Sequence, residues 1–222
     1  MKLRTRLLST VAAIGLSAVA LPAAAVDYFF NVTDVGTFGA PTYGTVSLVQ
    51  DGTSVDFKIA LDPEFNFVST GGHNVFSFNG TGVLASDITG ITDSTGQSFE
   101  VVSPNAVNPP FGTFQFGITC SANCKNGGPG YGGPLEFTVA NAVVNDFLVQ
   151  STLPPGSHLA YFAADVFWNP ETNQPRTGAI GVTQLTTPVP EPETYALFLA
   201  GLASLGVAAR RHHHREAARR GD

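Results

Sequence analysis

Apolar and polar residues alternate with a period of two from Tyr43 to Leu61, and this alternation constrains the fold more than any other feature of the chain. A period of two places alternate side chains on opposite faces of a β-strand. The dipeptide Asp51-Gly52 in the middle of the stretch is typical of a two-residue turn between antiparallel strands. Counting outward from that turn pairs Leu48 with Val55 on one face. The sequence therefore predicts a hairpin with one buried and one solvated face.

Short strand-like runs continue through the rest of the body, separated by clusters of Gly, Pro, Asn and Asp. They are residues 74–78, 98–102, 113–119, 135–139, 146–150, 158–168 and 179–184. No long segment of the body has sustained helical spacing, and 24 Gly and 15 Pro in the chain disfavour long helices. Many short strands without helices between them predict an all-β fold, an antiparallel β-sandwich of jelly-roll type. Closure into a barrel stays open as an alternative.

The amino terminus has the three parts of a secretory signal peptide. Lys2, Arg4 and Arg6 form a basic region, residues 7–21 are apolar, and Ala23-Ala24-Ala25 is a small-residue cleavage site. We expect signal peptidase to act after Ala25, with residues 1–25 as the signal peptide.

The body between the two ends, residues 26–187, is strongly acidic. It holds three basic residues against nine Asp and four Glu, a formal charge of −10, whereas the whole chain has −6. A polyanionic surface disfavours nucleic acid and anionic lipid as partners. Its length suits a single domain with a proper core.

Two cysteines, Cys120 and Cys124, lie close together in an exported chain, which meets an oxidising compartment. A local disulfide is the first interpretation. A metal or redox site is the alternative, although the spacing differs from the C-x-x-C of redox enzymes and no second ligand pair lies nearby.

The body offers few residues for catalysis. His73 and His158 are its histidines, and no nucleophile elbow, zinc-protease helix or phosphate-binding loop accompanies them. We therefore predict a structural or capping role for His73, and no enzyme. A Gly-rich loop at 125–134, which holds Tyr131, and a Pro-rich loop at 103–110 are the candidate binding loops, the former being the first choice.

Metal and sugar binding remain as alternatives. The acidic pairs Asp62 with Glu64 and Asp87 with Asp93 could serve as calcium ligands or as glycosidase carboxylates. The stretch from Asp87 to Gly96 fits a solvated turn, with a calcium site as the alternative. We expect no cofactor and keep calcium as an option. Stacking on a sugar would need an exposed aromatic ring, for which the candidates are Trp168, Tyr131 and Tyr43.

The carboxyl terminus has a second tripartite signal. Pro190-Glu191-Pro192 is followed by an apolar stretch over residues 195–209 and then by the basic pair Arg210-Arg211. About 15 apolar residues in a helix span about 22 Å, less than the roughly 30 Å of a bilayer core. This length favours a transient transmembrane helix over a permanent anchor. Basic residues at both ends of the chain place both termini in the cytoplasm and the body outside the inner membrane.

Residues 188–222 resemble the PEP-CTERM sorting domain of exported bacterial proteins, which an exosortase is thought to recognise. The resemblance implies that Pro190, Glu191 and Pro192 form the recognition element and that Arg210 and Arg211 form the basic stop. It also implies an association with exopolysaccharide and biofilm matrix. The tail departs from the usual pattern because it continues through three histidines to Asp222.

These features predict a non-enzymatic protein of the envelope, cell surface or extracellular matrix, with residues 26–187 as its β-sandwich domain. Its expected partners are signal peptidase, an exosortase, the inner membrane transiently and matrix polysaccharide. A carbohydrate-binding module, with or without calcium, is the alternative, and a polysaccharide-active hydrolase is the third candidate.

Overall fold

The structure, a computed structural model, describes residues 25–33, 42–93, 96–121, 124, 130–168, 176–185 and 201. These residues form antiparallel sheets and two short 3-10 helices, η1 (Ala85–Asp87) and η2 (Val144–Phe147). The predicted all-β fold with antiparallel sheets is confirmed, while the jelly-roll connectivity stays a prediction. No helix within the described part of the chain is long and apolar enough to cross a membrane. Of the predicted transmembrane helix 195–209, only Gly201 belongs to that part.

One sheet has five strands in the spatial order β1-β3-β4-β12-β7. Its inward side chains are apolar and alternate with polar outward ones, as the burial of β3 and β12 shows. The strands are β1 (Ala25–Phe29), β3 (Gly44–Asp51), β4 (Ser54–Leu61), β12 (Leu135–Ala140) and β7 (Ile88–Asp93).

A second sheet has the order β2-β15-β14-β6-β11-β8, and β5 also pairs with β14. β14 is buried on both faces, which explains its nearly continuous apolar sequence. The strands are β2 (Val32–Thr33), β15 (Arg176–Val182), β14 (Phe162–Trp168), β6 (Phe76–Phe78), β11 (Phe116–Cys120), β8 (Phe99–Val102) and β5 (Phe65–Phe67).

The two sheets share one aromatic core. Phe57 of the five-stranded sheet stacks on Phe137 beside it, with ring centroids 4.5 Å apart. The same ring contacts Phe78 and Phe162 of the second sheet at 5.3 and 6.4 Å. Phe147 of η2 packs edge-on against it from one end at 4.8 Å. The sheets therefore face each other, and Phe57 lies at the centre of their contact.

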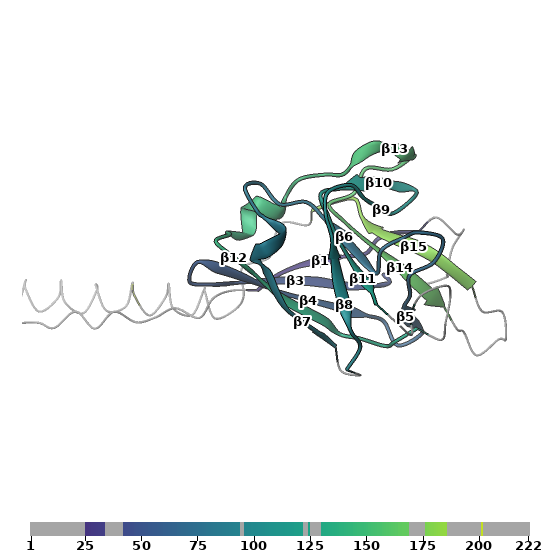
Figure 1. The fold of residues 1–222 in the computed structure, drawn as a ribbon, viewed down its shortest axis with the longest axis horizontal. Helices are drawn as coiled ribbons and strands as arrows, with labels where there is room; N and C mark the ends of the chain where they lie inside the picture. Colours follow the sequence, from purple (N-terminus) through teal and green to yellow (C-terminus); the bar gives the residue numbers. More distant parts are fainter. Residues whose placement is uncertain are drawn as a thin grey trace, which may run out of the picture.

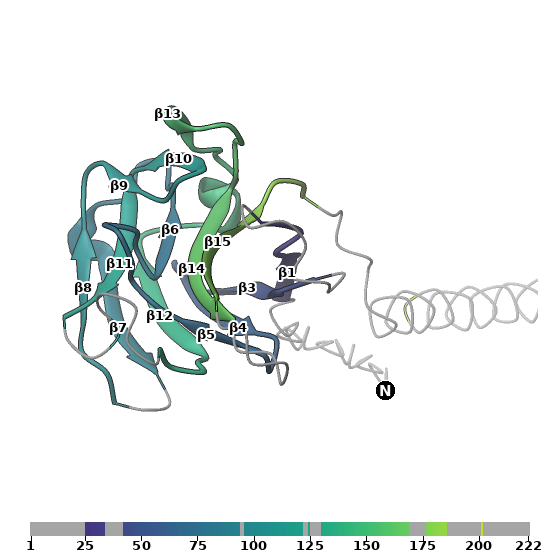
Figure 2. The same cartoon turned by 90° about the vertical axis from the view of Figure 1, so that its right-hand side faces the viewer.

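A small third sheet covers part of the outer face of the second one (Figures 1 and 2). Phe111 and Phe114 of this sheet pack against Ala163 and Ala179, which point away from the main core. This cover explains why β14 is buried on both faces. Its strands are β13 (Thr152–Gly156), β10 (Phe111–Phe114) and β9 (Ala106–Val107), in the order β13-β10-β9.

The predicted hairpin forms, but its register differs by two residues. Its turn is Gly52-Thr53, and Asp51 pairs with Ser54. Leu48 consequently lies opposite Phe57 and not opposite Val55. A shift of two residues leaves the predicted buried and solvated faces unchanged.

Two other predictions are wrong, one of a strand and one of a turn. Residues 146–150 overlap η2, where the carboxylate of Asp146 accepts a hydrogen bond from the Val143 N–H and turns the chain. The stretch from Asp87, predicted as a solvated turn, is largely the edge strand β7.

Candidate functional site

The connection from β5 to β6 forms an arch over β14, and this arch carries the candidate site. β14 pairs with β6 at Ala164 and with β5 at Val166, so Asp165 lies where the partner strand changes. The Val68 N–H donates to the Asp165 carbonyl at 3.1 Å, and the Asp165 N–H donates to the Val75 carbonyl at 3.3 Å. These two hydrogen bonds close the base of the arch.

A tight turn shapes the top of the arch. The His73 N–H donates to the Thr70 carbonyl at 2.7 Å, across Gly71 and Gly72. Both glycines have positive φ, 57° and 87°, a conformation that side chains disfavour. The sequence Thr-Gly-Gly-His thus brings the side chains of Thr70 and His73 to the same residue of β14.

That residue, Asp165, is fully buried. Both the N–H and the hydroxyl of Thr70 donate to its Oδ2, the hydroxyl at 2.7 Å. Its Oδ1 has no hydrogen-bond donor among the described residues and lies 3.8 Å from Nδ1 of His73. A buried carboxylate is costly unless donors surround it, and Thr70 supplies two of them. Asp165 therefore ties the arch to the sheet and lies behind His73.

His73 in turn lines a hollow of about 440 Å³ on the outer face of the second sheet. Its side chain is 22% exposed, and Nδ1 is on the buried side of the ring. The Ser69 hydroxyl donates to the His73 carbonyl at 2.7 Å and lies 3.2 Å from the hydroxyl of Thr119. The lining residues are Ser69, Gly72, His73, Asn74, Val102, Asn105, Val107 and Thr119. We call this hollow the His73 pocket.

The cysteine pair supports one wall of the His73 pocket. Cys120 and Cys124 lie at disulfide distance, with Cα atoms 5.9 Å apart. Cys120 directly follows the pocket residue Thr119, and the carbonyl of Cys124 accepts a hydrogen bond from the Ser69 N–H at 2.8 Å. A disulfide here links β11, which carries Thr119, to the residue that holds Ser69 of the arch.

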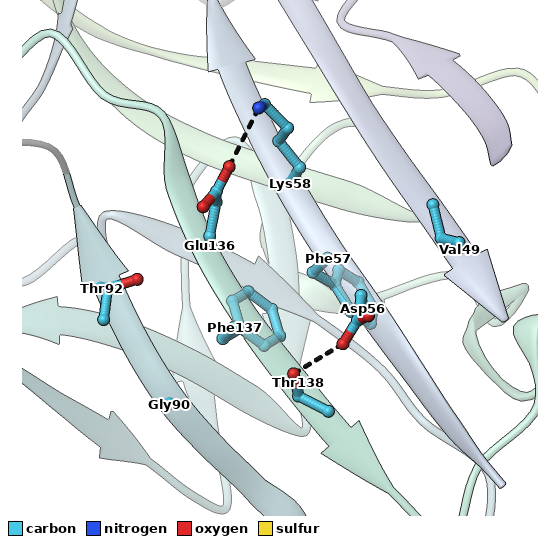
Figure 3. A pocket seen from close by; sticks show the side chains of 9 residues that line it. All are labelled: Val49, Asp56, Phe57, Lys58, Gly90, Thr92, Glu136, Phe137 and Thr138. Carbon is cyan, nitrogen blue, oxygen red and sulfur yellow. Dashed lines mark hydrogen bonds and ion pairs between the residues drawn. The ribbon is translucent and has the colours of Figure 1, made fainter. Parts of the chain in front are cut away.

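A second hollow, of about 470 Å³, lies on the outer face of the five-stranded sheet (Figure 3). Its charged groups are engaged with one another across the strands. Lys58 pairs with Glu136 at 3.0 Å, and the Thr138 hydroxyl donates to Asp56 at 2.6 Å. Lys58 and Glu136 are each about half exposed, so their ion pair adds little to stability. This face is a solvated sheet surface, as the predicted hairpin requires.

Comparison with known proteins bears on the carboxyl terminus. Residues 188–211 match the PEP-CTERM protein-sorting motif. The chain carries a PEP-CTERM sorting motif. No curated protein and no solved structure shows significant similarity to the chain.

The PEP-CTERM motif implies exosortase-dependent export to the cell envelope or surface. The predicted recognition element Pro190-Glu191-Pro192 and the basic pair Arg210-Arg211 fall within the matched range. Both lie outside the residues that the structure describes, as does Ala23 of the predicted signal-peptide cleavage site. Ala25 is described and begins β1.

The three aromatic residues that were candidates for stacking on a sugar are buried or half-buried. Tyr131 is buried, stacks on Phe67 at 5.1 Å and is therefore not the exposed ring that the Gly-rich loop suggested. Tyr43 is buried as well. Trp168 is half-buried and donates its indole N–H to Glu64 at 3.2 Å. Stacking of a sugar on Tyr131 or Tyr43 is thereby excluded.

The predicted acidic pairs do not converge on one site. Asp87 directly precedes β7 and Asp93 ends it, so six residue steps along a strand separate them by about 20 Å. Asp93 accepts a hydrogen bond from the Gln97 N–H, and Asp62 faces Thr42. A single ion cannot bind both Asp87 and Asp93.

The Pro-rich loop and His158 are the remaining candidates from the sequence. Asn105 and Val107 of the Pro-rich loop line the His73 pocket, so this loop contributes to the candidate site and the first-choice loop does not within its described residues. His158 lies against Phe111 with ring centroids 6.2 Å apart. Sequence reasoning missed Ser69, Thr119 and Asp165. For Asp165 a signal existed, because a carboxylate inside the apolar run Phe162–Trp168 indicates a buried polar role.

Replacing Tyr131 with phenylalanine is expected to stabilise the fold by about 1 kcal/mol at neutral pH. The hydroxyl is buried and has no hydrogen-bond partner among the described residues. Burial, together with the negative charge of Asp93, raises the pKa of Tyr131. Because an unfolded tyrosine ionises near pH 10 while the folded one stays protonated, the native protein loses stability above about pH 10.

The variant lacks this alkaline loss, so its advantage over the native protein should grow above pH 10. Urea denaturation at neutral and alkaline pH measures both effects, with Tyr161→Phe at a partly exposed ring as the control. A variant that is less stable than the native protein at neutral pH would show that the hydroxyl is satisfied.

Proposed function

We propose that the protein is a non-enzymatic component of the cell envelope or extracellular matrix, which the PEP-CTERM motif delivers. The observation that carries the proposal is the match of residues 188–211 to that sorting motif. The motif follows an acidic all-β body whose outer sheet face carries the Lys58–Glu136 ion pair and the hydrogen bond from Thr138 to Asp56. A soluble, strongly negative surface of this kind suits a protein that functions outside the inner membrane.

The proposed route has two cleavages. Signal peptidase acts after Ala25, and the apolar stretch 195–209 then holds the chain transiently in the inner membrane. The exosortase recognises Pro190, Glu191 and Pro192 and releases the body to the surface, leaving Arg210 and Arg211 in the cytoplasm. An apolar stretch too short to span the bilayer comfortably supports a transient stage.

Expression of the double variant Pro190→Ala with Pro192→Ala is expected to leave most of the protein unprocessed in the inner membrane. Loss of the rigid Pro-Glu-Pro backbone removes the shape that the exosortase recognises. Fractionation with immunoblotting and intact mass spectrometry would measure the unprocessed share and both cleavage points. Pro175→Ala, outside the matched range, is the control and should be processed normally. Normal release of the double variant would refute this route.

A binding module for matrix polysaccharide is the second candidate, and the polar His73 pocket favours it. A polysaccharide-active hydrolase, the third candidate, needs two carboxylates that face one sugar bond. Asp56 and Glu136 share the outer face of the five-stranded sheet, but each is already bound, to Thr138 and Lys58. The geometry therefore supports binding over hydrolysis.

A further inference from the structure

The His73 pocket combines groups that both donate and accept hydrogen bonds. Asn105 supplies a carboxamide that donates and accepts, and His73 supplies an imidazole. Ser69 and Thr119 supply hydroxyl oxygens that accept, because the Ser69 proton goes to the His73 carbonyl and the Thr119 proton to Ser69. Hydroxyl groups of a ligand also donate and accept, so such a lining can satisfy several of them at once. Val102 and Val107 add an apolar surface that a C–H face of a sugar ring can cover. The volume lies in the range of about 300–1,000 Å³ that is usual for small-molecule sites.

Charge narrows the class of ligand. Among the described residues that line the pocket, none is Lys, Arg, Asp or Glu. The body around it carries a formal charge of −10, so an anionic ligand would be repelled, and the described lining residues offer it no basic group. A neutral ligand has neither disadvantage.

The arch makes the pocket a preorganised site. Asp165 holds Thr70 by two hydrogen bonds, and its other oxygen lies 3.8 Å from Nδ1 on the buried side of His73, so the remainder of the imidazole ring lines the hollow. The Ser69 hydroxyl is held by the His73 carbonyl and lies beside Thr119. Side chains fixed before a ligand arrives lose little entropy on binding. A buried carboxylate behind a pocket histidine supports a binding role beyond that of a surface turn.

We propose that the His73 pocket binds a neutral sugar unit through His73, Ser69, Thr119 and Asn105. This deepens the second candidate function, and it rests on that function in taking the unit to be part of a polysaccharide. The interaction is based on hydrogen bonds and lacks an aromatic platform, so the affinity for a single unit is millimolar, and longer chains gain by contacts beyond the pocket.

Titration of the full-length, ¹⁵N-labelled chain with neutral sugars tests the proposal by NMR. The chain is held in a phosphocholine detergent, which has no sugar headgroup. D-glucose, D-galactose and cellobiose are the neutral probes, and D-glucuronate is the anionic one. We expect at least one neutral probe to shift the amide signals of Ser69, Asn105 and Thr119, and glucuronate to leave them unchanged.

Substitutions of the lining residues test whether these amide shifts arise from binding in the His73 pocket. Thr119→Val should weaken binding about tenfold through loss of one hydrogen bond, and His73→Ala at least as much. Asn105→Asp, on an exposed loop where folding is not at risk, should also weaken it. Thr92→Val, in the hollow of the five-stranded sheet, is the matched control and should bind normally.

Three results would overturn the proposal: no shift at about 100 mM of any neutral probe, where a millimolar site is saturated, equal binding of glucuronate, or shifts confined to the outer face of the five-stranded sheet. These results concern binding alone. Export is read in cells from the Pro190 and Pro192 variant, so a failure of one proposal is distinguishable from a failure of the other.

Discussion

Replacing Phe57 with alanine is expected to lower the free energy of unfolding by about 3–5 kcal/mol. The ring is 2% exposed and contacts aromatic rings from both large sheets and from η2. Its removal leaves a cavity at the contact between the sheets, which rigid strands on both sides cannot fill by collapse. Such a loss is a large share of the roughly 5–15 kcal/mol that holds a domain folded.

The matched control is Phe29→Ala, which removes the same side chain from the edge strand β1. Phe29 is 41% exposed, so its loss should cost about 1 kcal/mol or less. Urea denaturation followed by the fluorescence of Trp168, the single tryptophan, measures both variants. Equal losses for the two variants would mean that Phe57 is not central to the core.

The hairpin from Gly44 to Leu61 shows what the sequence pattern can predict and where it stops. Alternation of apolar residues predicts the two strands and their faces, both of which the structure shows. The turn is ambiguous because Gly52 can supply a positive φ either in Asp51-Gly52 or in Gly52-Thr53. The two registers bury the same face, so hydrophobicity cannot distinguish them.

Strands in which apolar and polar residues do not alternate cannot be predicted from periodicity. β13 contains Pro154 and Pro155 and is mostly exposed, so neither periodicity nor propensity indicates it. It forms because β10 offers a partner, Thr113 facing Thr152. Conversely, residues 146–150 read as a strand, but the local hydrogen bond between Val143 and Asp146 favours a helical turn.

The candidate site is less predictable than the fold because its parts are distant in sequence. Ser69 and His73 come from the arch, Asn105 from a loop, Thr119 from β11 and Asp165 from β14. No fixed spacing connects these residues, since sheet order alone brings them together. The sorting motif is the opposite case, because a linear recognition element is complete in Pro190-Glu191-Pro192.

Replacing Asp165 with alanine is expected to lower the free energy of unfolding by about 3 kcal/mol. The change leaves two donors of Thr70 without their acceptor and His73 without the carboxylate at 3.8 Å. Asp165→Asn keeps an oxygen for Thr70 and a similar volume, so it should cost about half as much.

The matched control is Asp56→Ala, because Asp56 is also a strand carboxylate that accepts a hydrogen bond from a threonine hydroxyl. It differs from Asp165 in burial, since it lies on the solvated face of the five-stranded sheet (Figure 3). Water replaces the lost partner there, so we expect a loss below about 1 kcal/mol. Urea denaturation compares the three variants, and the amide signals of Ser69 and His73 report on the arch. Suppose that Asp165→Ala lowers the free energy of unfolding no more than Asp56→Ala does and leaves those amide signals unchanged. The carboxylate then does not hold the arch, and the His73 pocket is not preorganised by it.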